Sequence, residues 1–203
     1  MGVIFDPNLT WRIHVEHIRR KILKNIFLLR KARSFINGNV AKLLYYTIIQ
    51  SHLDYCSSVW SNTVNTVLNR LRVLQKRALR IVLQVDYTVR TNILFQRLKV
   101  NPIDFRWKKA NLVLLFKAIH EFNVPKYLSS RIQMKCNPYM LRNSVFQILL
   151  PKPKTDFLKR SFMYSSSKIF NSLPLETRQL CNINTFLCKL ETNCFNRKMQ
   201  YIL

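Results

Sequence analysis

Four residue types used in nucleophilic catalysis stand together in the stretch HLDYCSSVW at positions 52–60. A cysteine, a histidine and an acid can act as nucleophile, base and orienting group when folding places their side chains in series. On a helix, however, His52 and Cys56 share one face while Asp54 points elsewhere. On a strand the three side chains follow one another along one side. Neither geometry forms a ready catalytic triad, because the members of such sites usually come from separate elements.

We therefore interpret this stretch as the packed end of a helix. Its apolar and aromatic side chains are expected to point inward: Leu53, Tyr55, Val59 and Trp60. Asp54 and the serines are expected to satisfy nearby backbone donors.

Metal sites find little support in the residue pattern. Polymerases and nucleases hold two metal ions with closely grouped carboxylates, yet the chain has 9 acidic residues and its nearest pair, Asp6 and Glu16, lies ten positions apart. A zinc site needs about four ligands, typically with two cysteines a few residues apart. Cys181, Cys188 and Cys194 are spaced by seven and six, and the alternative is that they are small apolar side chains on terminal helices. We expect this chain to bind no metal and no cofactor.

The charge is the outstanding feature of the composition. The chain of 203 residues is 48% hydrophobic and can bury the core of one large or two small domains. It carries 34 Lys and Arg against 9 Asp and Glu, a formal net charge of +25. A compact chain with this much like charge repels itself, so a polyanionic partner is expected. The candidates are nucleic acid, an anionic membrane surface and an acidic protein.

Simple counts argue against several other function classes. The longest uninterrupted aliphatic and aromatic run, residues 112–116, is far shorter than the roughly 20 residues of a spanning helix, so no transmembrane segment is expected. With Gly2 and Gly38 as the only glycines, there is no glycine-rich phosphate loop. Five scattered cysteines argue against a disulfide framework and favour a reducing compartment, the nucleus or the cytoplasm.

The apolar spacing predicts a mainly α fold. Few glycines and few turns favour long elements, and helices are predicted at residues 11–33, 40–54, 67–82, 91–98, 105–122, 157–171 and 184–195. Asn8 or Thr10 is the expected cap of the first helix. Residues 145–150, in a proline-rich region, are predicted to form a short buried strand. The expected architecture is a helical bundle followed by a smaller, loop-rich helical tail with one or two short strands.

Basic side chains cover the predicted helices away from their apolar stripes. In residues 67–82 the buried face follows Val67, Leu71, Leu74, Ala78 and Ile81, and the arginines fall on the other sides of the wheel. We take the following as candidate nucleic-acid-binding residues: Arg19, Arg20, Lys24, Arg70, Arg72, Lys76, Arg77, Arg80, Arg106, Lys108 and Lys109.

An ordered series of motifs resembles one protein family. GVIFDPNLTW at 2–11, followed by His14, resembles the segment after the catalytic palm in reverse transcriptases of non-LTR retrotransposons, the LINE-like elements. LYYTIIQSHLDYCSSVW at 44–60 and LRVLQKRALR at 71–80 are similar to the helices that follow it. The later motifs resemble the family's C-terminal tail: VPKYL at 124–128, Leu141-Arg142, KRSF at 159–162 and IFNSLP at 169–174.

The resemblance implies a truncated reverse transcriptase. Residues 1–84 would be the end of a palm hairpin plus a thumb-like helical region, residues 85–125 connecting helices, and residues 126–203 the tail. The fingers and the palm, whose aspartates bind magnesium in the family, would be missing, and they would be the natural packing partner. The chain would then not be an enzyme itself, although the parent family is an RNA-directed DNA polymerase.

Two function hypotheses follow. The first is non-specific binding of RNA or RNA/DNA duplex through basic helix faces, because a thumb places such faces against phosphates and sugars. The alternative is a basic helical interaction module in which residues 11–33 dock on an acidic protein or an anionic membrane surface.

Overall fold

The computed structural model describes residues 2–135 and 146–195, with side chains up to Glu191. The chain forms two compact units, Met1–Arg106 and Trp107–Leu203. Helices make up most of the described residues, so the predicted mainly α fold is confirmed. The division into 1–84, 85–125 and 126–203 stays a prediction.

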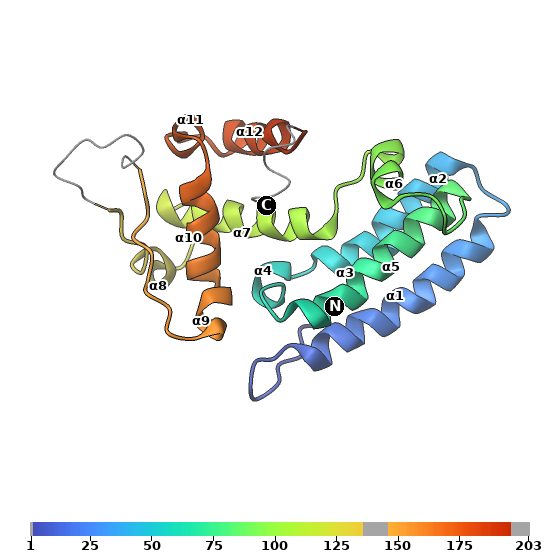
Figure 1. The fold of residues 1–203 in the computed structure, drawn as a ribbon, viewed down its shortest axis with the longest axis horizontal. Helices are drawn as coiled ribbons and strands as arrows, with labels where there is room; N and C mark the ends of the chain where they lie inside the picture. The colour runs from blue at the N-terminus through green and yellow to red at the C-terminus, as the bar shows by residue number, and fades with distance from the viewer. Residues whose placement is uncertain (1, 136–145, 196–203) are drawn as a thin grey trace. The chain divides into compact units, whose positions relative to one another are not determined.

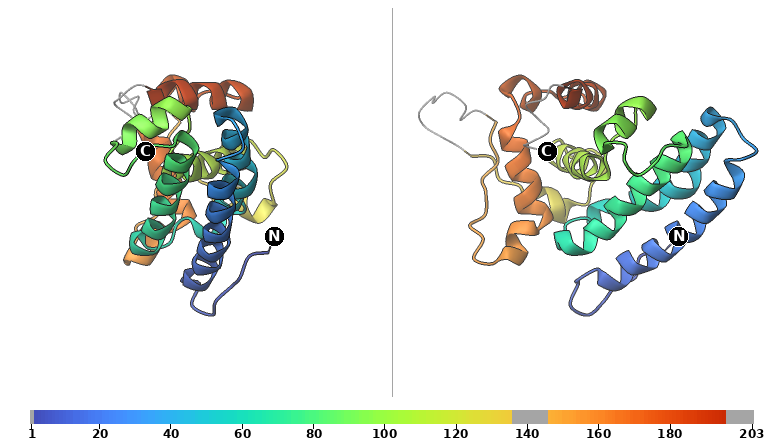
Figure 2. Two further views of the ribbon diagram at one scale, coloured as in Figure 1. Left: turned by 90° about the vertical axis from the view of Figure 1, so that its right-hand side faces the viewer. Right: turned by 45° about the vertical axis from the view of Figure 1, so that its right-hand side comes forward.

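Two long helices, α1 (Arg12–Ala32) and α5 (Asn65–Leu83), form the centre of the first unit. They run side by side in the same direction in every view (Figures 1 and 2). Their apolar stripes meet, which removes nonpolar surface from water. The stripe predicted on α1 is buried: Val15, Ile18, Ile22, Ile26 and Leu29. The buried stripe of α5 is rotated slightly from the predicted one, since Leu68, Leu79 and Val82 are buried whereas Val67 and Ile81 are half-buried.

The segment between α1 and α5 forms a nearly continuous helical run where one helix was predicted at 40–54. It consists of α2 (Gly38–Leu44), the π-helix η1 (Tyr45–Gln50) and α3 (Ser51–Asp54). Asn37 caps α2, because its side chain accepts a hydrogen bond from the Val40 amide at 2.9 Å. The short helix α4 (Ser57–Trp60) leads into α5, and α6 (Thr91–Leu98), which packs against α5, has the predicted bounds.

The predicted caps of the first helix are wrong. Neither Asn8 nor Thr10 caps α1, and the Asp6 carboxylate instead accepts from the Thr10 hydroxyl at 2.7 Å and from the Thr10 and Trp11 amides at 2.8 Å each. Trp11 has a left-handed conformation, φ 61°, so the chain turns sharply into the helix and brings these donors to Asp6. The hydrogen bonds, that from the Thr10 side chain first, lower the pKa of Asp6.

A buried hydrogen-bond network joins α5 to the π-helix and to the start of α7. The Gln75 side chain lies at its centre. Its amide nitrogen donates to the Tyr45 hydroxyl at 3.0 Å and to the Asn101 carbonyl at 3.2 Å, and its oxygen accepts from the Ile103 amide at 3.1 Å. The Tyr45 hydroxyl donates in turn to Gln50. Burial raises the pKa of Tyr45, so the hydroxyl stays protonated and able to donate.

His14 makes the stability of the first unit sensitive to acid. Its ring is 2% exposed and packs edge-on against Trp60. Its Nδ1 accepts from the Ile4 amide at 3.3 Å. Its Nε2 is buried without a hydrogen-bond partner among the described residues. Burial, followed by the charges of His17 and Lys21, lowers the pKa of His14 below 6.5.

We expect the free energy of unfolding to fall as the pH drops below about 6.5. Above this pH the histidine is neutral in both states. Below it the unfolded chain binds a proton that folded His14 resists, so the unfolded state gains stability. Urea unfolding between pH 7.5 and 5.5 checks this, with His14→Gln as the variant. The slope against pH should be shallower in the variant, although His52, whose pKa is also lowered by burial, leaves a residual slope. Equal slopes would contradict the assignment to His14.

The second unit packs around one apolar cluster. Its helices are α7 (Ile103–Ile119), which begins in the first unit, α8 (Lys126–Ser129), α9 (Asp156–Arg160), α10 (Phe162–Ser172), α11 (Leu175–Arg178) and α12 (Ile183–Phe195). The core consists of Leu112, Leu115, Phe116, Ile148, Phe170, Leu173, Phe186 and Leu190. Phe116 of α7 stacks on Phe186 of α12 with ring centroids 4.3 Å apart. The helices predicted at 105–122 and 184–195 are present with shifted ends, and the segment predicted as helical at 157–171 forms two helices, α9 and α10, separated by Ser161.

The strand predicted at 145–150 is wrong in its described part. Among the described residues Ile148 forms an isolated antiparallel bridge with Met134, and the chain there has no regular strand. The bridge is held by hydrogen bonds from the Lys135 amide to the Gln147 carbonyl and from the Leu149 amide to the Gln133 carbonyl, each 2.7 Å. On the opposite edge the Ile148 amide donates to the Asn171 side chain, which donates to the Ile148 carbonyl, each at 2.9 Å, so a side chain occupies the place of a further strand. Val145 and the Leu141-Arg142 motif lie outside the described residues.

No described helix combines the length and the apolar character that crossing a membrane requires.

Candidate nucleic-acid interface

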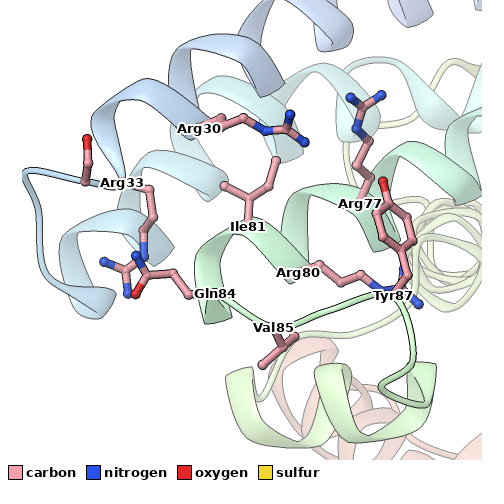
Figure 3. Close-up of a pocket in the computed structure, with 9 residues that line it drawn as sticks. Arg30, Arg33, Arg77, Arg80, Ile81, Gln84, Val85 and Tyr87 are labelled. Atoms are coloured by element: carbon pink, nitrogen blue, oxygen red, sulfur yellow. The ribbon is translucent and has the colours of Figure 1, made fainter.

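The C-terminal ends of α1 and α5 enclose a pocket of about 280 Å³, the arginine pocket (Figure 3). Its lining residues come from α1, from α5 and from the loop after α5: Arg30, Arg33, Ser34, Arg77, Arg80, Ile81, Gln84, Val85 and Tyr87. Four arginines and no acidic residue line the pocket. This concentration of guanidinium groups suits an anion that accepts several hydrogen bonds.

The parallel course of the two helices creates this pocket. Gln84 ends α5 in a left-handed conformation, φ 54°, and the Val85 amide then donates to the Arg80 carbonyl at 3.2 Å. The loop consequently turns back across the helix end. Arg33, at the end of α1, links this helix to the end of α5, because its Nε donates to the Val82 carbonyl at 3.0 Å. Its Nη1 donates to the Ile36 carbonyl in the turn after α1 at 2.6 Å.

Charge in the arginine pocket outweighs the helix dipoles. Each helix C-terminus carries roughly half a negative charge, so α1 and α5 together oppose an anion with about one unit. The positive charge of the four arginines exceeds this opposing charge severalfold. The Nε atoms of Arg77 and Arg80 are buried and have no hydrogen-bond partner among the described residues, so these donors remain available.

A second hollow, the amino-terminal groove, lies at the start of α1. Its volume is about 530 Å³, and it is lined by Ile4, Arg12, Ile13, Glu16, His17, Arg19, Arg20 and Arg70. Glu16 pairs with Arg19 at 2.9 Å, Arg70 at 3.2 Å and Arg20 at 3.6 Å. The hydrogen bond from Arg19 is the main reason that the pKa of Glu16 is lowered. One glutamate holds three arginines in place without cancelling their charge, so the groove stays cationic.

Six of the eleven predicted binding residues lie outside the arginine pocket and the amino-terminal groove. Arg72 is held by Asp104, with Nε 2.9 Å from both carboxylate oxygens, and Arg106 is held by Asp54. Lys109 pairs with Glu191 in the second unit, where Lys108 also lies. Lys24 is exposed on α1 and Lys76 is half-buried on α5. Arg77 and Arg80 line the arginine pocket, and Arg19, Arg20 and Arg70 line the groove.

Sequence reasoning missed Tyr87 and did not select Arg12, Arg30 and Arg33. Arg30 and Arg33 stand three positions apart at the end of a predicted helix, which could have drawn attention to them. Tyr87 carries no such signal. Its ring lies 5.3 Å from the Arg80 guanidinium and is 71% exposed.

The stretch at 52–60 is a joint between α3 and α4. Leu53 and Trp60 are buried as predicted, whereas the prediction for Tyr55 and Val59 is wrong, since they are 39% and 47% exposed. Cys56 adopts a left-handed conformation, φ 50°, which breaks the helix and turns its neighbours outward.

The polar residues of this joint serve the fold. Asp54 accepts from the Gln50 side chain at 2.8 Å and from Arg106, so the prediction that it satisfies backbone donors is wrong. Cys56 is exposed and forms no disulfide. Its thiol raises the pKa of the neighbouring Tyr55 hydroxyl.

Among residues 2–135 and 146–191, no three His, Cys, Asp or Glu side chains lie close enough to hold a metal ion. Cys181 and Cys188 are exposed and form no disulfide. Cys188 lies on the terminal helix α12, as interpreted, whereas Cys181 precedes this helix. Cys188 points to solvent on α12 while Leu190 takes the buried position. The Cys194 side chain lies outside the described residues.

Two curated proteins are similar to about half of the chain. The RNA-directed DNA polymerase from mobile element jockey of Drosophila funebris is 33% identical over 107 residues, which are 51% of this chain and 12% of that protein. The probable RNA-directed DNA polymerase from transposon X-element of Drosophila melanogaster is 26% identical over 107 residues, again 51% and 12%. No protein-family profile and no solved structure matches. The resemblance to non-LTR retrotransposon reverse transcriptases is thus confirmed, and the matched part spans about an eighth of each relative.

Proposed function

We propose that this chain binds RNA or RNA/DNA duplex without sequence specificity, through the arginine pocket and the amino-terminal groove of its first unit. The observation that carries the proposal is the convergence of Arg30, Arg33, Arg77 and Arg80 in one hollow that no acidic residue lines. Similarity to proteins named RNA-directed DNA polymerases supports a nucleic acid as the polyanion. The proposal is a binding role, and it assigns no catalytic step to this chain.

Phosphates are the natural ligands of such an interface. An arginine fork donates two parallel hydrogen bonds to one phosphate, and a bound phosphate releases condensed counterions from the nucleic acid. These contacts position a helix without reading its bases. The two sites lie on opposite halves of α1, with Arg12 at its start and Arg30 in its last turn. Residues 18 positions apart on a helix are about 27 Å apart, so one duplex can contact both sites along the helix.

Neutralising the arginine pocket should weaken binding of an RNA/DNA hybrid by at least about tenfold, because each charged hydrogen bond contributes roughly 1.5–3 kcal/mol. The variant is Arg30→Gln, Arg77→Gln and Arg80→Gln together, since Arg33 also holds the fold through backbone carbonyls. The matched control removes three exposed charges outside both sites, Arg97→Gln, Arg131→Gln and Lys168→Gln. Fluorescence anisotropy measures the affinities at one salt concentration, and circular dichroism confirms folding. Equal losses in both variants would contradict a localised interface.

The alternative, an anionic membrane surface, is favoured by a different observation. α1 and the turn after it expose Phe27, Leu28 and Phe35, at 58%, 57% and 89%. The Lys31 ammonium lies over the Phe27 ring, 4.8 Å from its centroid. Apolar side chains flanked by lysines are typical of helices that lie on lipid. Co-sedimentation with vesicles containing phosphatidylserine tests it: pelleting that Phe27→Ser with Phe35→Ser abolishes, without loss of hybrid binding, would support a membrane role.

A further inference from the structure

The arginine pocket contains more than phosphate binding requires. At its edge the Tyr87 side chain is 71% exposed, and its ring lies 5.3 Å from the Arg80 guanidinium carbon. Figure 3 shows this ring beside the end of the Arg80 side chain. Arg80 covers one side of the ring in a cation–π contact. Arg80 is itself held from behind, because its Nη2 donates to the Val89 carbonyl at 3.5 Å.

An exposed aromatic ring beside a phosphate site offers a surface on which a base can stack. The guanidinium behind Tyr87 fixes the ring and withdraws electron density from it, which favours a further π system on the opposite side. Within a duplex both faces of every internal base are already covered by neighbouring base pairs. A base that reaches Tyr87 must therefore be unpaired.

We propose that the arginine pocket and Tyr87 together form a subsite for single-stranded nucleic acid. One backbone phosphate lies among Arg30, Arg77 and Arg80, where the Nε atoms of Arg77 and Arg80 have no other partner among the described residues. The adjoining base stacks on the exposed face of Tyr87. This inference rests on the proposed function and deepens it, because it assigns a strand preference to one end of the interface. The amino-terminal groove has arginines but no such ring among its lining residues.

The pocket's size agrees with this occupant. Its volume of about 280 Å³ exceeds the space of a few waters, each of which takes about 30 Å³ of liquid. A phosphate with its attached sugar atoms therefore fits, and the base remains outside on the ring. The apolar side chains of Ile81 and Val85 line the same pocket and can contact the sugar.

The test measures the affinity of the full chain for two probes of the same length: a single-stranded RNA without self-complementarity, and a blunt RNA/DNA hybrid. Tyr87→Ala should lower affinity for the single strand by about 5- to 100-fold, the range found for losing one stacked base. It should leave affinity for the hybrid within about twofold. Tyr87→Phe keeps the ring and should bind the single strand as tightly as the unchanged chain does. If the hydroxyl made the contact instead, this variant would lose affinity as well. Because Tyr87 is exposed, the melting temperature should hardly change.

Two outcomes would overturn the inference. Tyr87→Ala without effect on the single strand would remove the stacking role. Equal losses for both probes would show that Tyr87 supports the interface generally. The proposed function is tested separately by the hybrid and the triple arginine variant. If the triple variant loses hybrid affinity while Tyr87→Ala changes neither probe, the inference fails and the proposed function stands.

Discussion

Replacing Trp60 with alanine should lower the free energy of unfolding by about 3 to 5 kcal/mol, the range for removing a large aromatic side chain from a core. Trp60 is 0% exposed and is the largest fully buried side chain described. Its indole nitrogen donates to the Tyr55 carbonyl at 2.9 Å, and its ring packs against His14, 5.7 Å away between centroids. The substitution removes all of this at once, because it opens a cavity and leaves the Tyr55 carbonyl without this donor.

The measurement is urea unfolding followed by circular dichroism, which does not depend on the tryptophan itself. Val59→Ala is the matched control, since the neighbouring side chain is 47% exposed and its truncation should cost less than about 1 kcal/mol. A loss below about 1 kcal/mol for Trp60→Ala would show that this joint does not belong to the cooperative core.

Gln75→Leu should destabilise the chain nearly as much, by about 1–3 kcal/mol for each buried group that loses its partner. Two such groups are at stake: the Ile103 amide, which donates to Gln75 at 3.1 Å, and the Asn101 carbonyl, which accepts at 3.2 Å. Leucine has a similar volume and adds apolar burial, so the substitution opens no cavity. A loss of stability is then attributable to the missing hydrogen bonds. Gln75 is 2% exposed, which leaves little access for replacement by water.

Gln75→Glu is the informative second variant. It keeps the shape and an acceptor for the Ile103 amide, but it loses the donor to Asn101 and to Tyr45 and introduces a buried charge. We expect it to be at least as destabilising as Gln75→Leu at pH 7 and to recover stability as the pH falls and the carboxyl becomes protonated. Full stability of Gln75→Leu in urea unfolding would contradict the role of the network.

Periodicity was sufficient to predict the elements whose apolar stripe faces one neighbour. The α1 stripe from Val15 to Leu29 and the bounds of α6 follow directly from spacing. Spacing could not show that Gln75 replaces an apolar residue on the α5 stripe, because its partners Asn101 and Ile103 lie more than 25 positions away.

Backbone conformation explains the local errors. A left-handed residue at Cys56 exposes Tyr55 and Val59, and one at Trp11 leaves α1 without a side-chain cap and directs the Trp11 amide to Asp6. Neither residue is a glycine, so the sequence contains no signal for these turns.

The candidate interface was predictable in its composition but not in its geometry. A helical wheel placed Arg72 nearly opposite the buried face and Arg77 on one flank, both within a broad basic surface. The fold pairs Arg72 with Asp104, 32 positions away, and leaves Arg77 in the pocket. The meeting of Arg30 with Arg80 depends on the parallel packing of α1 and α5, which follows from the path of residues 38–60 between them.

The most direct test of the central claim is the salt dependence of binding between the full chain and an RNA/DNA hybrid. If three to six arginines of the two sites contact phosphates, the logarithm of the association constant should fall with the logarithm of salt concentration with a slope of about −3 to −5, close to −0.9 per contact. The triple variant of Arg30, Arg77 and Arg80 should flatten this slope by about 2 to 3. A slope near zero, or one that the variant leaves unchanged, would contradict a phosphate-binding interface at the ends of α1 and α5.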